Sequence, residues 1–131
     1  MNTINIKILL LTFFLFKVFA FAYSQQTRID SLATMLPKTQ SYEEKIKILN
    51  ELSLLLQRTN PDSALSTIEM ALQLSQEKND KKRIAESLKN MGNIYYGKNN
   101  HAKAQKNYNS AIELFESLHD TLGLAKIYNN L

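Results

Sequence analysis

The chain contains an internal repeat at an offset of 40, and this repeat constrains the fold more than any other feature of the sequence. Identical residues coincide at that offset: Asn50 with Asn90, Asn60 with Asn100, Ala64 with Ala104, Ala71 with Ala111, Leu74 with Leu114, Asp80 with Asp120, Ala85 with Ala125 and Asn90 with Asn130. Between them, apolar residues recur at the three- and four-residue spacing of amphipathic helices. The interval accommodates two helices, so the sequence predicts an all-α array of antiparallel helical hairpins.

Residues that are typical of helix starts divide the predicted array into separate helices. Ser41 with Glu44 fits a capping box, and Asn60 followed by Pro61 fits an N-cap with proline at the first helical position. Asp80 and Asp120 are the corresponding candidate caps further on. Because every connection is short, neighbouring helices must be antiparallel. The densest basic run, at residues 81–83, is interpreted as a solvated loop.

The first 22 residues differ sharply in composition from the rest and are predicted to be a signal peptide. Five of the six phenylalanines lie there (Phe13, Phe14, Phe16, Phe19 and Phe21), and Ala20-Phe21-Ala22 supplies a small-x-small cleavage pattern. Cleavage is expected after Ala22. The alternative, an uncleaved membrane anchor, is disfavoured because the apolar stretch of 15 residues, 8–22, contains Lys17 and is shorter than the roughly 18 to 20 residues of a spanning helix. Residues 23–40 are interpreted as a lead-in with a short helix that Pro37 ends.

Composition excludes several classes of function for the remainder. Removing Lys7 and Lys17 with the leader lowers the formal net charge from +4 to +2, which argues against nucleic-acid binding. The chain has no cysteine, so it has neither a disulfide nor a lipid-modified cysteine. His101 and His119 are 18 positions apart with no converging carboxylates, and no glycine-rich phosphate loop is present. We therefore expect no catalytic residues, no metal and no cofactor.

One stretch resembles the tetratricopeptide repeat family, in the order Leu88, Met91-Gly92, Tyr95, Ala104, Tyr108 and Ala111. The resemblance implies an α-solenoid. Its units would be an atypical first repeat at 41–84, a repeat at 85–124 and the start of another at 125–131. The interval of 40 exceeds the usual ~34 residues, so a longer second helix or exit turn is expected. Gly92 is interpreted as a close helix crossing. Tyr95, Tyr108 and Tyr128 are expected in the core, with Tyr96 exposed.

The same resemblance implies a function in binding, because the first helix of each family unit lines a groove for a peptide or a partner helix. Here the groove residues would be Glu86, Lys89, Asn90, Asn93, Tyr96, Lys126, Asn129 and Asn130. Lys89, Asn93 and Asn130 resemble the first part of the carboxylate clamp that some family members use. A generic or solvated groove is the alternative.

The runs at 28–32, 47–52 and 90–96, together with the leader, resemble the exported sensory part of bacterial signalling proteins. In those proteins, repeats precede a transmembrane helix and a histidine kinase or a DNA-binding output domain. Ile127, Tyr128 and Leu131 are expected to face outward, which predicts the front end of a longer protein. A periplasmic or secreted interaction module for a sensor is the first hypothesis. A free-standing scaffold is its competitor, followed by a hydrolase accessory module and then an autonomous enzyme. Membrane contact would come only from the leader or a downstream helix.

Overall fold

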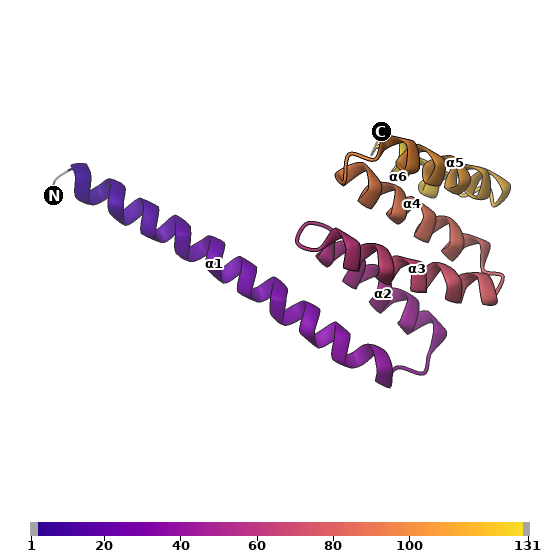
Figure 1. Ribbon diagram of the computed structural model, residues 1–131, viewed down its shortest axis with the longest axis horizontal. Helices are drawn as coiled ribbons and strands as arrows, with labels where there is room; N and C mark the ends of the chain where they lie inside the picture. The colour runs from indigo at the N-terminus through magenta and orange to yellow at the C-terminus, as the bar shows by residue number, and fades with distance from the viewer. Residues whose placement is uncertain (1–2, 130–131) are drawn as a thin grey trace.

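A computed structural model describes residues 3–129, which form six α-helices and one short 3-10 helix (Figure 1). The helices are α1 (Thr3–Met35), α2 (Tyr42–Leu56), α3 (Pro61–Glu77), α4 (Lys81–Gly97), α5 (His101–Ser117) and α6 (Thr121–Tyr128), with the 3-10 helix at Leu36–Lys38. From α2 onward, each helix runs antiparallel to the one before it and packs against it. The all-α hairpin array predicted from the repeat is confirmed.

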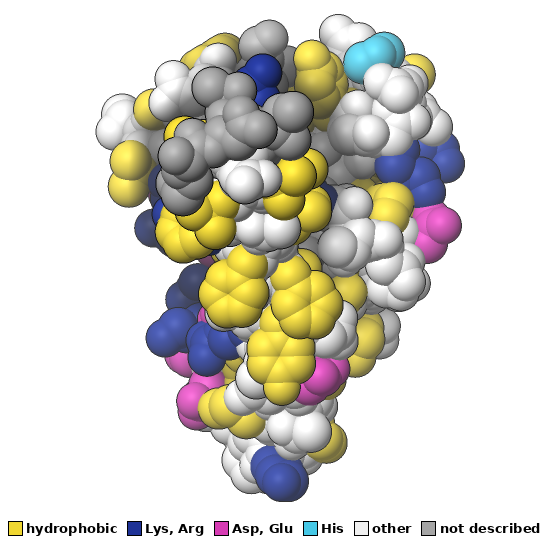
Figure 2. All heavy atoms as spheres, turned by 90° about the vertical axis from the view of Figure 1, so that its left-hand side faces the viewer, with side chains coloured by type: hydrophobic (Ala, Val, Ile, Leu, Met, Phe, Trp, Pro, Cys, Tyr) yellow, Lys and Arg dark blue, Asp and Glu magenta, His cyan; other side chains and the backbone are white. Residues whose placement is uncertain are grey.

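Helix α1 is longer than expected, because the leader and the lead-in helix form one continuous helix. No proline or glycine precedes Pro37, so nothing in the sequence interrupts it. Its large apolar side chains from Ile6 to Tyr23 are exposed, and hydrophobic side chains run down the middle of the face seen from its N-terminal side (Figure 2). The segment Asn5–Lys38 is long and apolar enough to cross a membrane, a criterion that an N-terminal signal sequence also meets.

Among the residues of α1 whose burial is described, those near its C-terminal end pack against the array. Leu32 is buried with Ile48 and Leu52 of α2. An ion pair between Arg28 and Glu51, with 2.7 Å between nitrogen and oxygen, flanks this cluster. The end of α1 therefore covers the face of α2 that would otherwise be exposed at the start of the array, as expected of a capping element in a repeat protein.

The three turns after α3, α4 and α5 are built alike. Each contains one residue in the left-handed region, Asn79, Asn99 or His119, with φ of 52°, 57° and 53°. The next residue is the N-cap of the following helix, and its side chain accepts a hydrogen bond from a backbone N–H three residues on. Helices α3, α4 and α5 each have 17 residues. The repeat interval is thus divided equally between the two helices of a unit, and residue 85, an expected unit boundary, lies inside α4.

Close helix crossings depend on glycine. A Cβ atom added to Gly92 would lie 2.5 Å from Cε1 of Tyr108, which confirms Gly92 as a crossing position. Gly123 has the same role in α6, where an added Cβ would lie 2.4 Å from Cδ1 of Phe115. The sequence reasoning did not assign this role to Gly123.

Two expectations about buried side chains near the C-terminal end are wrong. Ile127 has an exposed fraction of 0% and packs in a cluster with Tyr108 and Phe115, because α6 folds back against α5. Tyr128 is 59% exposed, so its expected place in the core is wrong, whereas its expected outward orientation is confirmed. The core position of Tyr108 and the exposure of Tyr96 are confirmed, and Tyr95 is partly buried. Leu131 lies outside the described residues.

Candidate functional site

A groove with a volume of about 650 Å³ crosses α2, α4 and α6, the first helices of successive hairpins. Helix α4 contributes its middle wall, since Glu86, Lys89, Asn90 and Asn93 follow one another at three- and four-residue spacing and share one face. Helix α2 contributes one side wall, and α6, together with the turn before it, contributes the other. We call this hollow the inner groove.

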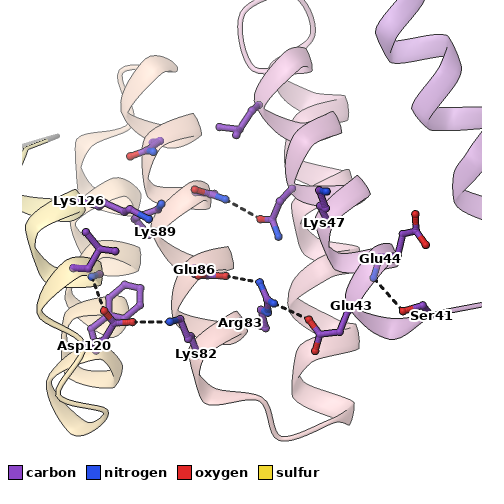
Figure 3. Close-up of a pocket in the computed structure, with 17 residues that line it drawn as sticks. Ser41, Glu43, Glu44, Lys47, Lys82, Arg83, Glu86, Lys89, Asp120 and Lys126 are labelled. Carbon is purple, nitrogen blue, oxygen red and sulfur yellow. Dashed lines mark hydrogen bonds and ion pairs between the residues drawn. The ribbon is translucent and has the colours of Figure 1, made fainter. Parts of the chain in front are cut away.

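Ion pairs fill the part of the inner groove nearest the turns at 78–80 and 118–120. The Arg83 guanidinium lies 2.7 Å from a Glu43 carboxylate oxygen and 3.3 Å from one of Glu86 (Figure 3). Beside it, the Lys82 ammonium lies 3.3 Å from Asp120. The pKa of Asp120 is lowered, first by the hydrogen bond from the Gly123 backbone N–H and then by Lys82. In this part of the groove, the protein's own charges neutralise one another.

The interpretation of residues 81–83 as a solvated loop is therefore wrong. These residues form the first turn of α4, because Asp80 caps the helix and accepts a hydrogen bond from the Arg83 backbone N–H at 3.1 Å. Arg83 is half-buried between two helices. Asp80 was identified as a candidate cap from the sequence, but the basic run after it was still assigned to the connection between two helices.

An amide pair crosses the centre of the inner groove. The Asn90 side-chain N–H donates to the Asn50 side-chain oxygen at 2.8 Å, and Asn50 donates to the Ile46 carbonyl at 2.9 Å. Asn90 is buried. A buried polar group is costly unless it is hydrogen-bonded, so this pair fixes how α4 lies against α2.

Lys89 of α4 and Lys126 of α6 lie beside each other in the inner groove (Figure 3). Within the described residues, neither ammonium forms an ion pair with a carboxylate. Burial lowers the pKa of Lys89, and the positive charge of Lys126 lowers it further, while Glu86 acts in the opposite direction. Lys47 lines the groove from α2. Lys47, Lys89 and Lys126 therefore bring positive charge to this part of the groove, and among the described residues none of the three forms an ion pair.

Five of the eight groove residues expected from sequence line the inner groove: Glu86, Lys89, Asn90, Asn93 and Lys126. Asn93 also accepts a hydrogen bond from the Tyr108 hydroxyl at 2.7 Å. Tyr96 is not a lining residue and packs edge-on against His101, with ring centroids 5.2 Å apart. Asn129 is exposed outside the groove lining, and Asn130 lies outside the described residues.

Sequence reasoning missed the contribution of α2, namely Glu43, Lys47, Asn50 and Leu54. One signal was present, since Asn50 aligns with Asn90 in the internal repeat. The residues of the turn before α6, and Phe115 beneath it, carried no such signal. In the part of the chain that the structure describes, no group of three or more His, Asp and Glu side chains could hold a metal ion.

Stacked helical hairpins with a groove along their first helices define a helical-repeat protein of the kind that binds other proteins. Residues 44–117, more than half of the chain, match the family model for the tetratricopeptide repeat. The chain therefore belongs to the tetratricopeptide repeat family. The match extends from the first turn of α2 to the end of α5 and leaves out α1 and α6. No curated protein and no solved structure matches the chain.

Proposed function

We propose that this chain is an extracytoplasmic peptide-binding module, the N-terminal sensory or scaffold part of a bacterial signal-transduction protein. The observation that carries the proposal is the inner groove, whose walls come from the first helices of successive hairpins. Among the described residues, Lys89 and Lys126 of this groove form no ion pair with a carboxylate, and Leu54 is exposed. An extended peptide or a partner helix would lie across α2, α4 and α6.

Apolar contact in the groove is available at Leu54, which lines it from α2 and is 53% exposed. Leu122, on α6, is also exposed and lines the groove. Exposed apolar side chains beside polar groups of fixed position are typical of surfaces that bind peptides, because the apolar contacts contribute affinity and the polar groups set the register. The groove thus offers both kinds of contact.

The binding proposal is tested by selecting random peptides displayed on phage against the full chain in a mild detergent. Selected peptides should lose affinity for Leu54→Arg, which places a large cation in the groove. Met70→Arg is the matched control, because Met70 is 54% exposed and lies on α3, outside the inner groove. Equal affinity for both variants would refute binding in the groove, as would the failure of any peptide to be selected.

The leader supports the proposal of export. Cleavage after Ala22 would remove the exposed phenylalanines and leave a mature chain starting at Tyr23. The contacts that α1 and the short 3-10 helix make with α2 involve residues 28–36, so they would remain after cleavage. Expression of the full gene in bacteria, followed by cell fractionation and N-terminal sequencing, tests this. Mature protein in the cytoplasm would contradict export, and an intact N-terminus in the membrane fraction would show that α1 is retained as an anchor.

The sensor and the free-standing scaffold differ in the segment that comes after the repeats. The coding sequence beyond Leu131 distinguishes them. An apolar stretch of about 20 residues and then a kinase or DNA-binding domain would support the sensor. A stop codon after further repeats would support the scaffold and refute the sensor.

A further inference from the structure

Helix α1 determines the side from which a membrane would meet the array. Residues 3–22 of this helix would extend about 30 Å, which matches the hydrocarbon thickness of a bilayer. Their large apolar side chains are exposed and have no cover from the described part of the chain. Lys17, the charged residue near the middle, lies over the Phe13 ring, with 4.7 Å from its nitrogen to the ring centroid. While α1 is attached, a lipid bilayer is the cover that suits this segment.

Contacts between α1 and α2 place the turn after α2 level with the end of that apolar segment. Arg28 and Glu51 form an ion pair at 2.7 Å, so these two residues lie level with each other. The two helices are antiparallel (Figure 1). Seven residues back from Arg28 and seven residues on from Glu51 therefore lead to the same level, at Phe21 and Arg58.

The turn after α4 lies at this level too. The hydrogen bond of 2.8 Å between Asn90 and Asn50 holds α4 beside α2 in parallel register, so residues 58 and 98 are level with each other. Figure 1 shows both turns on the side of the array toward which the N-terminal half of α1 extends. We call residues 57–63 and 96–103 the near edge. The opposite ends of the helices, at residues 36–44, 76–83 and 116–121, form the far edge.

The near edge carries positive charge that the chain leaves unpaired. Asp62 is the one acidic residue in its sequence, and it forms an ion pair with Lys98. Arg58 and Lys103 are exposed, and among the described residues neither forms an ion pair with a carboxylate. At the far edge, by contrast, acidic residues offset the basic ones: Glu43, Glu44, Glu77, Asp80, Glu116 and Asp120 against Lys38, Lys78, Lys81, Lys82 and Arg83.

Exposed tyrosines accompany the positive charge of the near edge. Tyr23, at the end of the apolar segment of α1, is 69% exposed, and Tyr96, at the near edge, is 50% exposed. Tyrosine is enriched at the level of lipid headgroups, and anionic headgroups attract basic side chains close to the membrane. The end of an apolar helix, two tyrosines and unpaired basic residues thus meet at one level, which is the composition expected of a surface in contact with headgroups.

We propose that the near edge binds the anionic headgroups of the bilayer that α1 enters, so that the array rests on the membrane surface. The first helices would then stand on that surface, and a peptide lying across them in the inner groove would run parallel to it. The proposal concerns the chain with α1 attached, as a precursor or as an anchored protein. It goes beyond the proposed peptide binding, because the residues of the near edge lie outside the groove lining.

The test measures how close each edge comes to the lipid headgroups. The chain has no cysteine, so a fluorophore can be attached at one introduced cysteine, either Ala102→Cys at the near edge or Gln76→Cys at the far edge. Both positions are exposed. Each labelled full chain is inserted into vesicles of phosphatidylcholine with or without phosphatidylglycerol. Both kinds of vesicle contain the same share of a lipid whose headgroup carries a nitroxide, which quenches fluorophores close to it.

We expect the label at position 102 to be quenched more in the vesicles that contain phosphatidylglycerol, and this difference to decline at high salt. The label at position 76 should be quenched little in either kind. Arg58→Gln should lower the ratio of docked to undocked chain about fivefold in the anionic vesicles, the factor expected for one basic residue near such a surface. Lys78→Gln is the matched control, because Lys78 is an exposed residue of the far edge. Circular dichroism checks that each variant is folded.

Four results would overturn the proposal. They are no quenching at position 102 in either kind of vesicle, equal quenching there in both kinds, equal quenching at positions 76 and 102, and equal effects of Arg58→Gln and Lys78→Gln. Peptide binding in the inner groove is measured on other residues, so either proposal can fail while the other stands.

Discussion

Adding one methyl group at Gly92 should destabilise the protein, although alanine is the better helix former. In an exposed helix, replacing glycine with alanine would stabilise the protein by about 1 kcal/mol. At Gly92, however, the new Cβ would lie 2.5 and 2.6 Å from two ring carbons of Tyr108. The ring has little room to move because it is only 2% exposed and its hydroxyl donates to Asn93. Overpacking of this kind costs about 1–3 kcal/mol, and loss of the hydroxyl hydrogen bond would add about 1 kcal/mol.

The net expectation for Gly92→Ala is a loss of about 1–3 kcal/mol in the free energy of unfolding. Gly97→Ala is the control on the same helix, because an added Cβ there meets nothing within 4 Å. It should leave stability unchanged or raise it by up to about 1 kcal/mol. Because 1 kcal/mol shifts the Tm of a small domain by roughly 4–8 °C, the two variants should be clearly separated.

The assay is thermal and urea unfolding of the full chain in a mild detergent, followed by far-ultraviolet circular dichroism. A double variant with Tyr108→Leu gives a second check, since a shorter side chain removes the obstacle. Gly92→Ala should then cost less than it does in the wild-type background. A Gly92→Ala protein as stable as Gly97→Ala would refute the argument that this crossing requires glycine.

Three further variants and one control variant test other parts of the structure by the same unfolding assay. Ser87→Ala should raise stability by about 1 kcal/mol, because its buried hydroxyl has no hydrogen-bond partner among the described residues; a loss of stability would show that the hydroxyl is satisfied. Leu32→Ala should cost about 2–3 kcal/mol if the end of α1 is packed on α2, whereas Leu122→Ala, at an exposed position, should change stability by less than about 0.5 kcal/mol. Asp120→Asn should reduce the acid sensitivity of the fold. Because the pKa of Asp120 is lowered in the folded protein, its ionised side chain stabilises the fold at pH values above its ordinary pKa of 3.8. This stabilisation is lost as the pH falls through the folded-state pKa. Wild type should therefore lose more stability than the variant between about pH 5 and 2, and parallel pH profiles would contradict this.

The sequence predicted the helix starts well because each depends on one local side chain. The predicted caps Asn60, Asp80 and Asp120 all accept the capping hydrogen bond, as does Asn100, which had not been predicted as a cap, and the first three of these four helices have the same length. Local sequence signals did not predict burial where contacts between helices determine it. Ile127 looked unpartnered in sequence, and only the return of α6 against α5 buries it.

The candidate site was predicted only in part, because some of its contacts also depend on how the helices pack. The resemblance to the tetratricopeptide repeat family indicated the α4 residues that share the groove face, from Glu86 to Asn93. It did not reveal that Arg83 bridges to Glu43, because that contact joins two helices that are far apart in the sequence. Nor did it show that Lys82 and Arg83 are neutralised within the groove while Lys89 and Lys126 are not. Which charged side chains form ion pairs depends on how the helices pack against one another.

The equal spacing of the three turns has a consequence for how such an array can gain or lose length. The left-handed residues Asn79, Asn99 and His119 recur at half the interval of the sequence repeat, so each helix with its turn is a module of constant size. Duplication of two modules would reproduce a hairpin and extend the groove by one first helix. Duplication of a single module would reverse the direction of every later helix and interrupt the groove with a second helix. Insertions of two modules should therefore be tolerated, and insertions of one module should abolish ligand recognition while the helices themselves persist.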